Sequence, residues 1–344
     1  MKRHRTLNGE QYRAGLHGFT LLVSACTFLL IVAGGMVTST DSGLAVPDWP
    51  LSYGQIMPPM VGGIFYEHGH RMIATFVGFL TVILAIWLWR VEKRQWVRTL
   101  GLMALFAVIL QGVLGGLTVI YLLPVWISVS HATLAQSFFS LTVFISAVTS
   151  RWWLEARPVE IPRAQTTRLL AILAVVVVFV QLILGALMRH TDSGLAVPDF
   201  PLTYGQLWPT LNQESLFSMN QRRAELDLLP VETTQIAIRL LHRLWALVVT
   251  VVIFSLARHV FRWYREVSCF RETALFLVLL VVFQVLLGAL TVLTGKSPSV
   301  TTAHVATGSL ILGGGVAFVS YAYRLLGVGS ESRVFGLAPG GGSP

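Results

Sequence analysis

Long apolar stretches without charged side chains divide this chain into segments of membrane-spanning length. Uncharged stretches recur from position 14 to position 323, and the stretch at 99–150 is long enough for two helices joined by a turn near Pro124. A helix needs about 20 apolar residues to cross the hydrocarbon core of a bilayer. The pattern therefore predicts an all-α integral membrane protein with eight transmembrane helices. The predicted spans are 16–38, 70–90, 99–121, 127–150, 168–189, 239–261, 273–294 and 301–323.

One motif occurs twice in the chain. Residues 40–50 read TDSGLAVPDWP and residues 191–201 read TDSGLAVPDFP, and each copy is soon followed by Tyr-Gly-Gln, at 53–55 and 204–206. Each copy follows the first helix of a group of four, so the chain divides into two four-helix repeats. Four spans return the chain to its starting side. We therefore expect parallel repeats, related by an axis along the membrane normal.

This repeat sets the predicted domain organisation. Two tandem four-helix bundles are expected at 16–150 and 168–326, with long outer loops at 39–69 and 190–238 on the same side of the membrane. The polar stretch at 213–235 predicts a helix on the membrane surface. The remaining parts are a cytoplasmic N-terminus at 1–15, a cytoplasmic linker at 151–167 and a disordered tail at 327–344.

Composition and charge support this topology. The chain is 54% hydrophobic and 12% charged, whereas soluble domains carry about 25% charged residues. The formal net charge of +9 would suit a nucleic-acid partner, but most of the 25 Lys and Arg fall on one side of the predicted topology. This positive-inside bias sets orientation. It places both termini in the cytoplasm and predicts no nucleic-acid partner.

Small residues and the repeated loop leave two structural questions open. Glycines in the first and third spans of each half favour close helix packing, or else the close approach of a flat ligand. The repeated loop is rich in turn-forming residues. It forms either a lid over a site, with Asp48 and Asp199 fixing its shape, or only a rigid connector. The glycines are at positions 34–35, 112, 115–116, 185 and 288.

Four of the nine histidines form two equivalent pairs. His70 with His131, and His242 with His304, begin the second and fourth spans of each half, near the outer face. Two histidines on different helices of a bundle suit an iron porphyrin, whose iron takes one imidazole from each side. A single such histidine is more often a helix–helix contact, and zinc would also recruit Cys or carboxylate ligands. His68 lies on roughly the opposite side of the helix from His70 and is not counted as a ligand.

Charged residues beside the histidines distinguish the two halves. Glu67 lies one helical turn before His70 and on the same face, whereas its counterpart in the second half is Arg239. A carboxylate at this depth is either functional or a water-facing anchor. Arg71 and Arg243 directly follow a histidine. They are candidates for haem propionate contacts, or they extend to the outer headgroups.

Together these residues resemble the haem A synthase family. The resemblance rests on GGMVTSTDSGLAVPDWP at 34–50, EHGHR at 67–71, LHR at 241–243, and the histidines His131 and His304. It extends over about residues 16–323. The likeness implies an eight-helix enzyme of the bacterial inner membrane that converts haem O to haem A for cytochrome oxidase. In the family, the porphyrin C8 methyl is hydroxylated successively, and the resulting gem-diol loses water to leave the formyl group.

The resemblance also implies roles for individual residues. His70 and His131 would hold the substrate haem in the N-terminal half, and His242 and His304 would hold a haem b cofactor in the C-terminal half. Glu67 matches the acidic residue expected to act at the substrate methyl. The implied partners are haem O, membrane lipid, a haem O synthase and cytochrome oxidase assembly factors.

One departure from the family concerns cysteine. Many members carry a cysteine pair in the first outer loop, whereas this loop has none. The chain has Cys26 in the first span and Cys269 in a cytoplasmic loop, which cannot pair with each other. A mechanism that needs a loop disulfide therefore does not apply.

Two other functions remain open from the sequence. A di-haem b-type electron carrier accounts for the histidines and the bundle, but not for a carboxylate in one half only. A haem transporter requires a path between the two faces, whereas all four histidines are predicted at one depth. Extraction of bound haem, with and without added haem O, distinguishes an enzyme from both.

Overall fold

A computed structural model describes residues 12–158 and 163–326, and this part of the chain is helical. The eight predicted spans are confirmed, because eight helices in the described part are long and apolar enough to cross a membrane. These are α1 (Ala14–Ser39), α2 (Gly62–Val91), α3 (Gln95–Ile120), α4 (Val125–Thr149), α6 (Ala164–His190), α8 (Thr233–Trp263), α9 (Ser268–Leu293) and α10 (Pro298–Leu325). The short helices are α5 (Arg151–Glu155), η1 (Ser193–Leu195) and α7 (Gln213–Glu225).

The helices that follow the outer loops begin earlier than the charge pattern predicts. Helix α2 begins at Gly62, so Glu67 and His68 lie inside it, and both side chains are buried. Helix α8 begins at Thr233, where the side chains of Glu232 and Gln235 form a capping box. Polar residues therefore lie within the first turns of these helices rather than before them.

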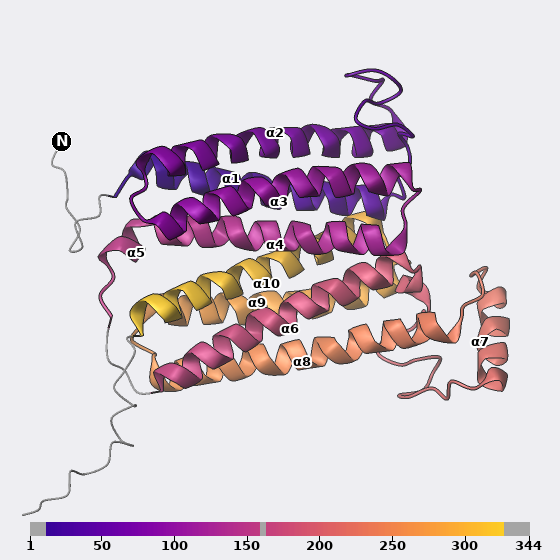
Figure 1. Ribbon diagram of the computed structural model, residues 1–344. Coiled ribbons are helices and arrows are strands. Elements are labelled where there is room, and N and C mark those ends of the chain that lie inside the picture. Colours follow the sequence, from indigo (N-terminus) through magenta and orange to yellow (C-terminus); the bar gives the residue numbers. More distant parts are fainter. Residues whose placement is uncertain (1–11, 159–162, 327–344) are drawn as a thin grey trace, which may run out of the picture.

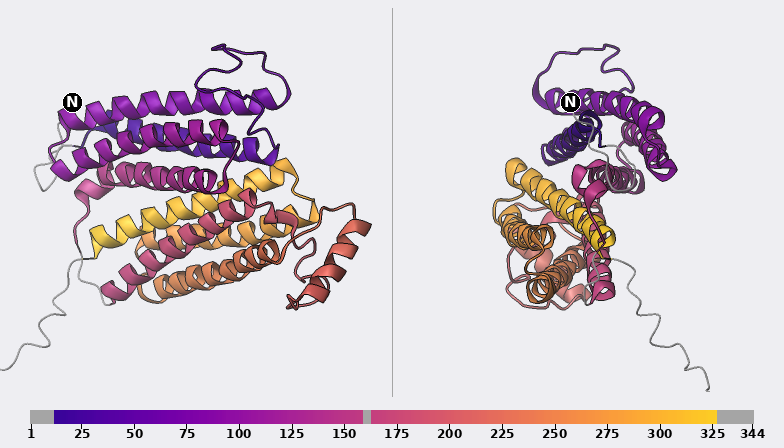
Figure 2. Two further views of the ribbon diagram at one scale, coloured as in Figure 1. Left: turned by 45° about the vertical axis from the view of Figure 1, so that its right-hand side comes forward. Right: turned by 90° about the vertical axis from the view of Figure 1, so that its left-hand side faces the viewer.

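The long helices form two rings of four. In the first ring α1 packs on α2, α2 on α3, α3 on α4 and α4 on α1; in the second the order is α6, α8, α9 and α10. Contacts between the rings join α1 with α10, α4 with α10 and α4 with α6 (Figures 1 and 2). Exchanging α1 with α6 and α4 with α10 reproduces this set of contacts. The arrangement is therefore consistent with two parallel repeats.

Side chains on α4 and α10 connect the two rings. Gln136 Nε2 donates to Ser309 Oγ at 2.9 Å, and these two residues occupy corresponding positions in the repeats. The ring of Phe139 lies against Gly313, where an added Cβ would approach it to 3.0 Å. Small and hydroxyl-bearing residues at such contacts are the usual means by which helices associate in lipid.

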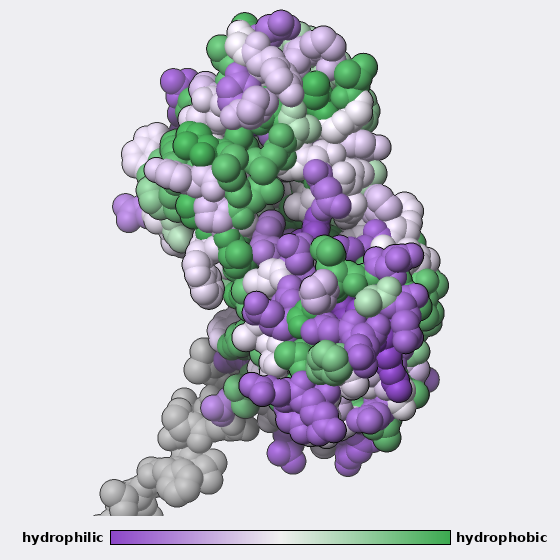
Figure 3. All heavy atoms as spheres, turned by 90° about the vertical axis from the view of Figure 1, so that its right-hand side faces the viewer, coloured by the Kyte–Doolittle hydropathy of each residue, from purple (hydrophilic) through white to green (hydrophobic). Residues whose placement is uncertain are grey.

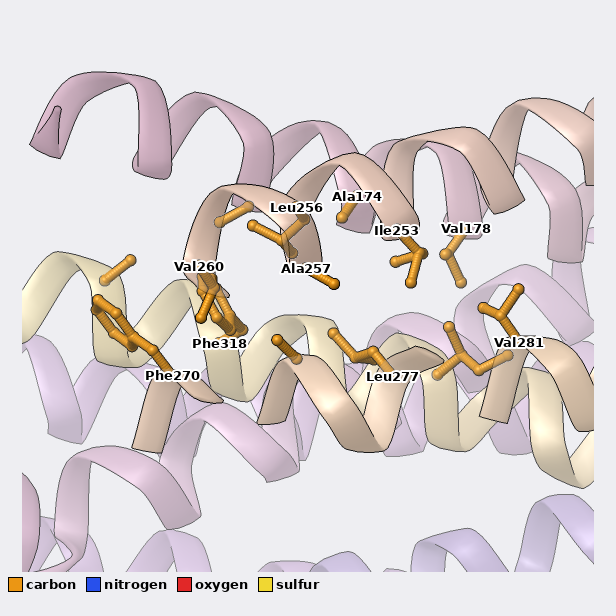
Figure 4. Packing of buried hydrophobic residues seen from close by; sticks show 14 of the residues in the cluster. Ala174, Val178, Ile253, Leu256, Ala257, Val260, Phe270, Leu277, Val281 and Phe318 are labelled. Atoms are coloured by element: carbon orange, nitrogen blue, oxygen red, sulfur yellow. The ribbon is translucent and has the colours of Figure 1, made fainter. Parts of the chain in front are cut away.

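Each ring has its own apolar core, displaced toward one end of the bundle. The core of the second ring contains Leu256, Leu277 and Phe318, all 0–1% exposed, with Phe270 packed against Phe318 (Figure 4). The first ring has a corresponding core on α1 to α4. Both cores occupy the end that carries α5, which we call the α5 end. We call the opposite end, which carries the two long loops, the loop end. Polar groups lie at this end.

The second loop is larger than the first and contains the predicted helix, although that helix is shorter than expected. Helix α7 ends at Glu225 rather than continuing toward position 235, and Asn212 caps it by accepting from the Ser215 N–H at 2.8 Å. Met219 packs it on a small cluster with Val197 and Ile236. Hydrophilic side chains gather over this part of the loop end (Figure 3).

Two other predictions concern the segments between and beyond the bundles. The linker 151–167 holds α5 and the first residues of α6. The predicted disordered tail at 327–344 and most of the N-terminus at 1–15 lie outside the described residues. Cys26 and Cys269 are both free thiols, which confirms that they do not pair.

Candidate functional site

Each copy of the repeated loop is folded by its own aspartate. The Asp48 carboxylate accepts from the backbone N–H groups of Tyr53 and Gly54 at 2.7 and 2.8 Å. The bond from Gly54 is the largest cause that holds the pKa of Asp48 below its usual value. Asp199 accepts the two corresponding bonds at 2.9 Å each. The predicted role of these aspartates in loop shape is confirmed.

An arginine then fixes each loop to the helix that follows it. Arg71 Nη1 donates to the carbonyl oxygens of Asp48 at 2.7 Å and Leu51 at 2.9 Å. Arg243 Nη1 donates to the Leu202 carbonyl at 2.9 Å, and its other terminal nitrogen binds the Asp199 carbonyl. Both guanidinium groups therefore hold the loop over the bundle. Their contact with haem propionates stays a prediction.

The four paired histidines each lie against a glycine of the preceding long helix. A Cβ placed on that glycine would come within 3.1–3.4 Å of the imidazole Cε1. These glycines therefore make room for an imidazole ring, whereas Gly116 instead contacts the Trp49 ring of the first loop. The four pairs are Gly34 with His70 (3.1 Å), Gly115 with His131 (3.2 Å), Gly185 with His242 (3.4 Å) and Gly288 with His304 (3.2 Å).

The two histidines of each predicted pair lie on diagonally opposite helices of one ring, His70 and His131 on α2 and α4, and His242 and His304 on α8 and α10. All four lie in the part of their helix nearest the loop end, and their pairing stays a prediction. The Nδ1 atoms of His70, His131 and His304 are buried without a hydrogen-bond partner. Buried polar atoms are rarely left without one. In the first unit, two imidazoles with an unused ring nitrogen each, on opposite helices of the ring, form a donor set that would suit a haem iron. In the second unit, Gln181 Nε2 lies within 3.4 Å of both ring nitrogens of His242. Zinc would usually take four ligands, and the described residues contain no group of three or more His, Cys, Asp or Glu.

Glutamines support three of these histidines, and sequence reasoning did not single them out. Gln111 Nε2 donates to the His131 carbonyl at 3.0 Å, and Gln284 Nε2 donates to that of His304 at the same distance. Gln181 Nε2 lies 3.2 Å from His242 Nε2. The recurrence of Gln111 as Gln284 in apolar helices was the available signal. Gln181 carried no such signal, because the corresponding residue in the first half is leucine.

Glu67 connects helix α2 to the first loop. Its side chain is buried, with Oε1 accepting from Arg71 Nη2 at 2.6 Å and Oε2 accepting from the Val46 N–H at 2.7 Å. The position three residues before His70 places it on the same helix face. Each carboxylate oxygen keeps a second lone pair. A buried, oriented carboxylate beside an imidazole can therefore still accept a proton or a further hydrogen bond.

His68 belongs to the loop contact rather than to the histidine pair. Its Nδ1 lies 2.8 Å from the Ser52 hydroxyl in the first loop, and the side chain is buried. This agrees with the prediction that His68 is not a partner of His70. His68 is thus the third side chain, after Arg71 and Glu67, that bonds helix α2 to the loop.

Arg239 occupies the position of Glu67 in the second half, and it lacks a compensating charge. It is 5% exposed, donates to the Met188 sulfur at 3.1 Å, and its buried Nε has no partner. No ion pair to Arg239 occurs within the part of the chain that the structure describes. It lies one helical turn before His242 on the same face of α8. An isolated buried cation is costly, so this site fits an anionic group such as a haem propionate.

The fold and the site define a class of protein: a multi-pass membrane protein of two four-helix units, each with two partly buried histidines beneath a folded loop. The chain belongs to the family described as cytochrome oxidase assembly protein, whose profile matches residues 17–62 and 61–314.

Relatives within this family have a named activity. The Heme A synthase of Lysinibacillus sphaericus is 26% identical over 306 residues, which cover 88% of this chain and 94% of that protein. The Heme A synthase of Shouchella clausii is 27% identical over 287 residues, covering 81% and 87%. That of Halalkalibacterium halodurans is 31% identical over 207 residues, covering 56% and 66%. The family resemblance drawn from the motifs is confirmed.

Proposed function

We propose that this protein is a haem A synthase, which oxidises a methyl group of haem O to a formyl group and so produces haem A. The family match and the relatives named Heme A synthase support this activity. One observation in the molecule supports this activity most strongly. The two halves have matched histidine pairs, but a buried carboxylate, Glu67, lies beside one pair only.

The ligand assignment follows this difference. His70 and His131 would hold haem O in the first unit, beside Glu67. His242 and His304 would hold a haem b in the second, where the uncompensated Arg239 suits a propionate. A haem b bound there supplies redox chemistry, that is, a centre able to accept an electron and pass it on.

Glu67 would act on protons at the substrate methyl. Converting a methyl to a formyl group removes electrons and protons and adds one oxygen. A fixed carboxylate can take up a proton from the attacking water, or stabilise positive charge as it develops at the carbon. Arg71 and Val46 hold the carboxylate in one orientation. The loop bound by Arg71 covers this position and would restrict access of bulk water.

We also propose the orientation in the membrane. The chain enters α1 and leaves α10 at the α5 end (Figure 1), and the segments at this end are rich in Lys and Arg. By the positive-inside rule, the α5 end is cytoplasmic. The haem sites then lie near the outer face of the bacterial inner membrane.

The replacement Glu67→Gln tests the enzyme assignment. It keeps the size of the side chain and removes its ability to act as a base. We expect both haems to remain bound, while haem O or its hydroxymethyl derivative accumulates and the rate of haem A formation falls about 10²–10⁴-fold. Chromatography of extracted haem measures this. Glu225→Gln, at the exposed end of α7, is the control. A normal haem A yield from Glu67→Gln contradicts the assignment.

The same extraction separates the enzyme from a di-haem electron carrier. A carrier accounts for the two histidine pairs but gives no role to a carboxylate in one half and a cation in the other. Protein supplied with haem O would then return haem O unchanged, whether or not Glu67 is intact. A haem transporter likewise returns its haem unchanged.

A further inference from the structure

One arginine joins the two units at the loop end. Arg189, in the last turn of α6 in the second unit, donates through Nη2 to the Thr38 carbonyl oxygen and to the Asp41 carboxylate, the latter at 2.5 Å. Thr38 lies in the last turn of α1, where carbonyl oxygens have no partner within the helix. Asp41 is among the first residues of the first loop. The second unit therefore binds the first loop at the point where that loop leaves its helix.

A threonine of the second unit holds the same end of α1 from another helix. Thr302, near the start of α10, is 5% exposed. Its Oγ1 donates to Ser39 Oγ and to the Met36 sulfur, both at 3.2 Å. Its methyl group lies against Gly35, 3.4 Å from an added Cβ. The last turn of α1 is thus bound by polar side chains from both α6 and α10.

This attachment runs in one direction only. The repeat aligns Arg189 with Thr38, and Thr302 with Val129. Thr38 uses its hydroxyl on carbonyl oxygens of its own helix, and valine has no hydrogen-bonding side chain. The second unit therefore fixes the first loop with side chains that the first unit does not supply in return. The first loop is also the one that bonds to a carboxylate, Glu67.

A short, buried segment leads from this attachment to Glu67. The Ser42 N–H donates to a carbonyl oxygen of α1 at 2.9 Å, and the Ala45 N–H donates to the Ser42 carbonyl at 3.1 Å. The next N–H, that of Val46, donates to Glu67 Oε2 at 2.7 Å. Ser42 and Val46 are 5% and 0% exposed. We call residues 41–46 the root of the first loop.

The root is packed tightly against the helix that carries Glu67. A Cβ added at Gly63, in the first turn of α2, would come within 2.8 Å of the Ala45 side chain and 3.2 Å of the Ser42 hydroxyl. Close packing of this kind transmits a displacement instead of absorbing it. A shift of the root at Asp41 is therefore passed on to Val46, whose N–H orients the carboxylate.

We propose that Arg189 is a positioning residue for Glu67, so that the second unit completes the reactive site of the first. The inference rests on the proposed function, because it takes Glu67 as the group that acts at the substrate methyl. Arg189 acts at a distance: it fixes the root, and the root fixes the Val46 N–H against the carboxylate. Holding a reacting group in its productive geometry lowers the barrier, and a small misplacement from a remote change slows the reaction.

Hydrogen exchange of the root tests the first step of this proposal without any turnover. Arg189→Met removes the donor and keeps much of the side chain. In haem-free protein, we expect the peptide that covers residues 41–46 to exchange about tenfold faster, because local opening becomes easier. The ion pair itself contributes little stability, since the Asp41 side chain is 80% exposed, so the variant should fold. Arg222→Met, exposed on α7, is the matched control.

The second step is tested by combining Arg189→Met with Glu67→Gln. Arg189→Met alone should slow haem A formation about 10–100-fold. The extract should still contain haem b and farnesylated haem (haem O, its hydroxylated forms and haem A summed). In protein that already carries Glu67→Gln, the change at Arg189 should cause no further loss of rate, because residues that act as a unit are not additive. Arg189→Lys, which keeps a cation, should restore part of the rate.

Each outcome of these experiments decides the question. Faster exchange of the root together with non-additive rates supports the proposal. Unchanged exchange overturns it, and so does an equal loss of rate with and without Glu67. If Arg189→Met loses either haem, Asp41→Asn is measured in the same two experiments, with the same two outcomes. Failure of the proposed function is distinct, because Glu67→Gln alone would then form haem A normally.

Discussion

The two halves of this molecule share one framework and differ in the charges placed on it. In both, a carboxylate folds the loop, an arginine binds the loop to the next helix, and each histidine rests on a glycine. At one position the first half has Glu67, paired with Arg71, and the second has Arg239 without a carboxylate. The shared parts suit the task proposed for both halves, which is holding an iron porphyrin. The charges that differ must serve the tasks that are not shared.

This difference also sets the relative electrostatics of the two sites. Glu67 and Arg71 neutralise each other in the first half, whereas Arg239 and Arg243 leave the second half with two cations. Positive charge near a haem favours its reduced form, since net charge is one of the factors that set its potential. A haem held in the second half would therefore be easier to reduce than one held in the first. Electrons removed from a substrate in the first half would flow toward it.

Removal of a proposed axial ligand should have the largest effect and tests whether the halves are independent. We expect His70→Ala to lose the farnesylated haem and all haem A formation, with haem b retained. His242→Ala should do the reverse and lose haem b. Each change leaves one iron with a single imidazole from the protein. Haem extraction and quantification of each species measure the outcome, and wild-type protein prepared in parallel is the reference. Equal loss of both haems from either variant contradicts the division of tasks.

The charge difference is tested next by Arg239→Met, which keeps much of the volume and removes the cation. Breaking a buried ion pair costs about 3–5 kcal/mol, so haem b affinity should fall by at least about 100-fold. The midpoint potential of any haem b that remains should become more negative. The haem-free protein, in contrast, should unfold at a higher temperature, because an uncompensated buried cation has been removed.

Arg262→Met, at the exposed end of the same helix, is the matched control for this variant. It should change neither haem b affinity nor potential. A variant of Arg239 that binds haem b normally, at the wild-type potential, would show that this cation does not face the porphyrin. Titration of haem into haem-free protein, followed by its Soret band, gives the affinity.

Much of this comparison could be predicted from the sequence, because it depends on features that are visible in the amino-acid pattern itself. Uncharged stretches predict the eight spans, and the repeated loop aligns the histidines in pairs. The exchange of Glu67 for Arg239 follows from the same alignment.

Other features depend on contacts between helices. The predicted start of α2 was wrong by eight residues. Glu67 and His68 lie inside the helix because they are buried under the loop and are not exposed to water. The bonds from Arg71 to loop carbonyls have no counterpart in the sequence pattern, since a carbonyl is present at every residue. The sequence allowed two interpretations of the glycines, close helix packing or the close approach of a ligand. Only the position of the imidazole rings shows what these glycines contact.

The smallest expected effect tests how closely the two frameworks match. A methyl group at Gly34 would lie 3.1 Å from the His70 ring, which must move, whereas one at Gly185 would lie 3.4 Å from His242, an ordinary contact. Displacing a ring from its preferred rotamer costs about 0.5–1.5 kcal/mol, so Gly34→Ala should lower farnesylated haem content by about 2–10-fold. Gly185→Ala should leave haem b nearly unchanged. Gly18→Ala, on α1 with no atom within 4 Å of the added methyl, controls for the helix itself. Equal losses from both halves would mean that the frameworks tolerate the same strain, and that the difference between them lies in charge alone.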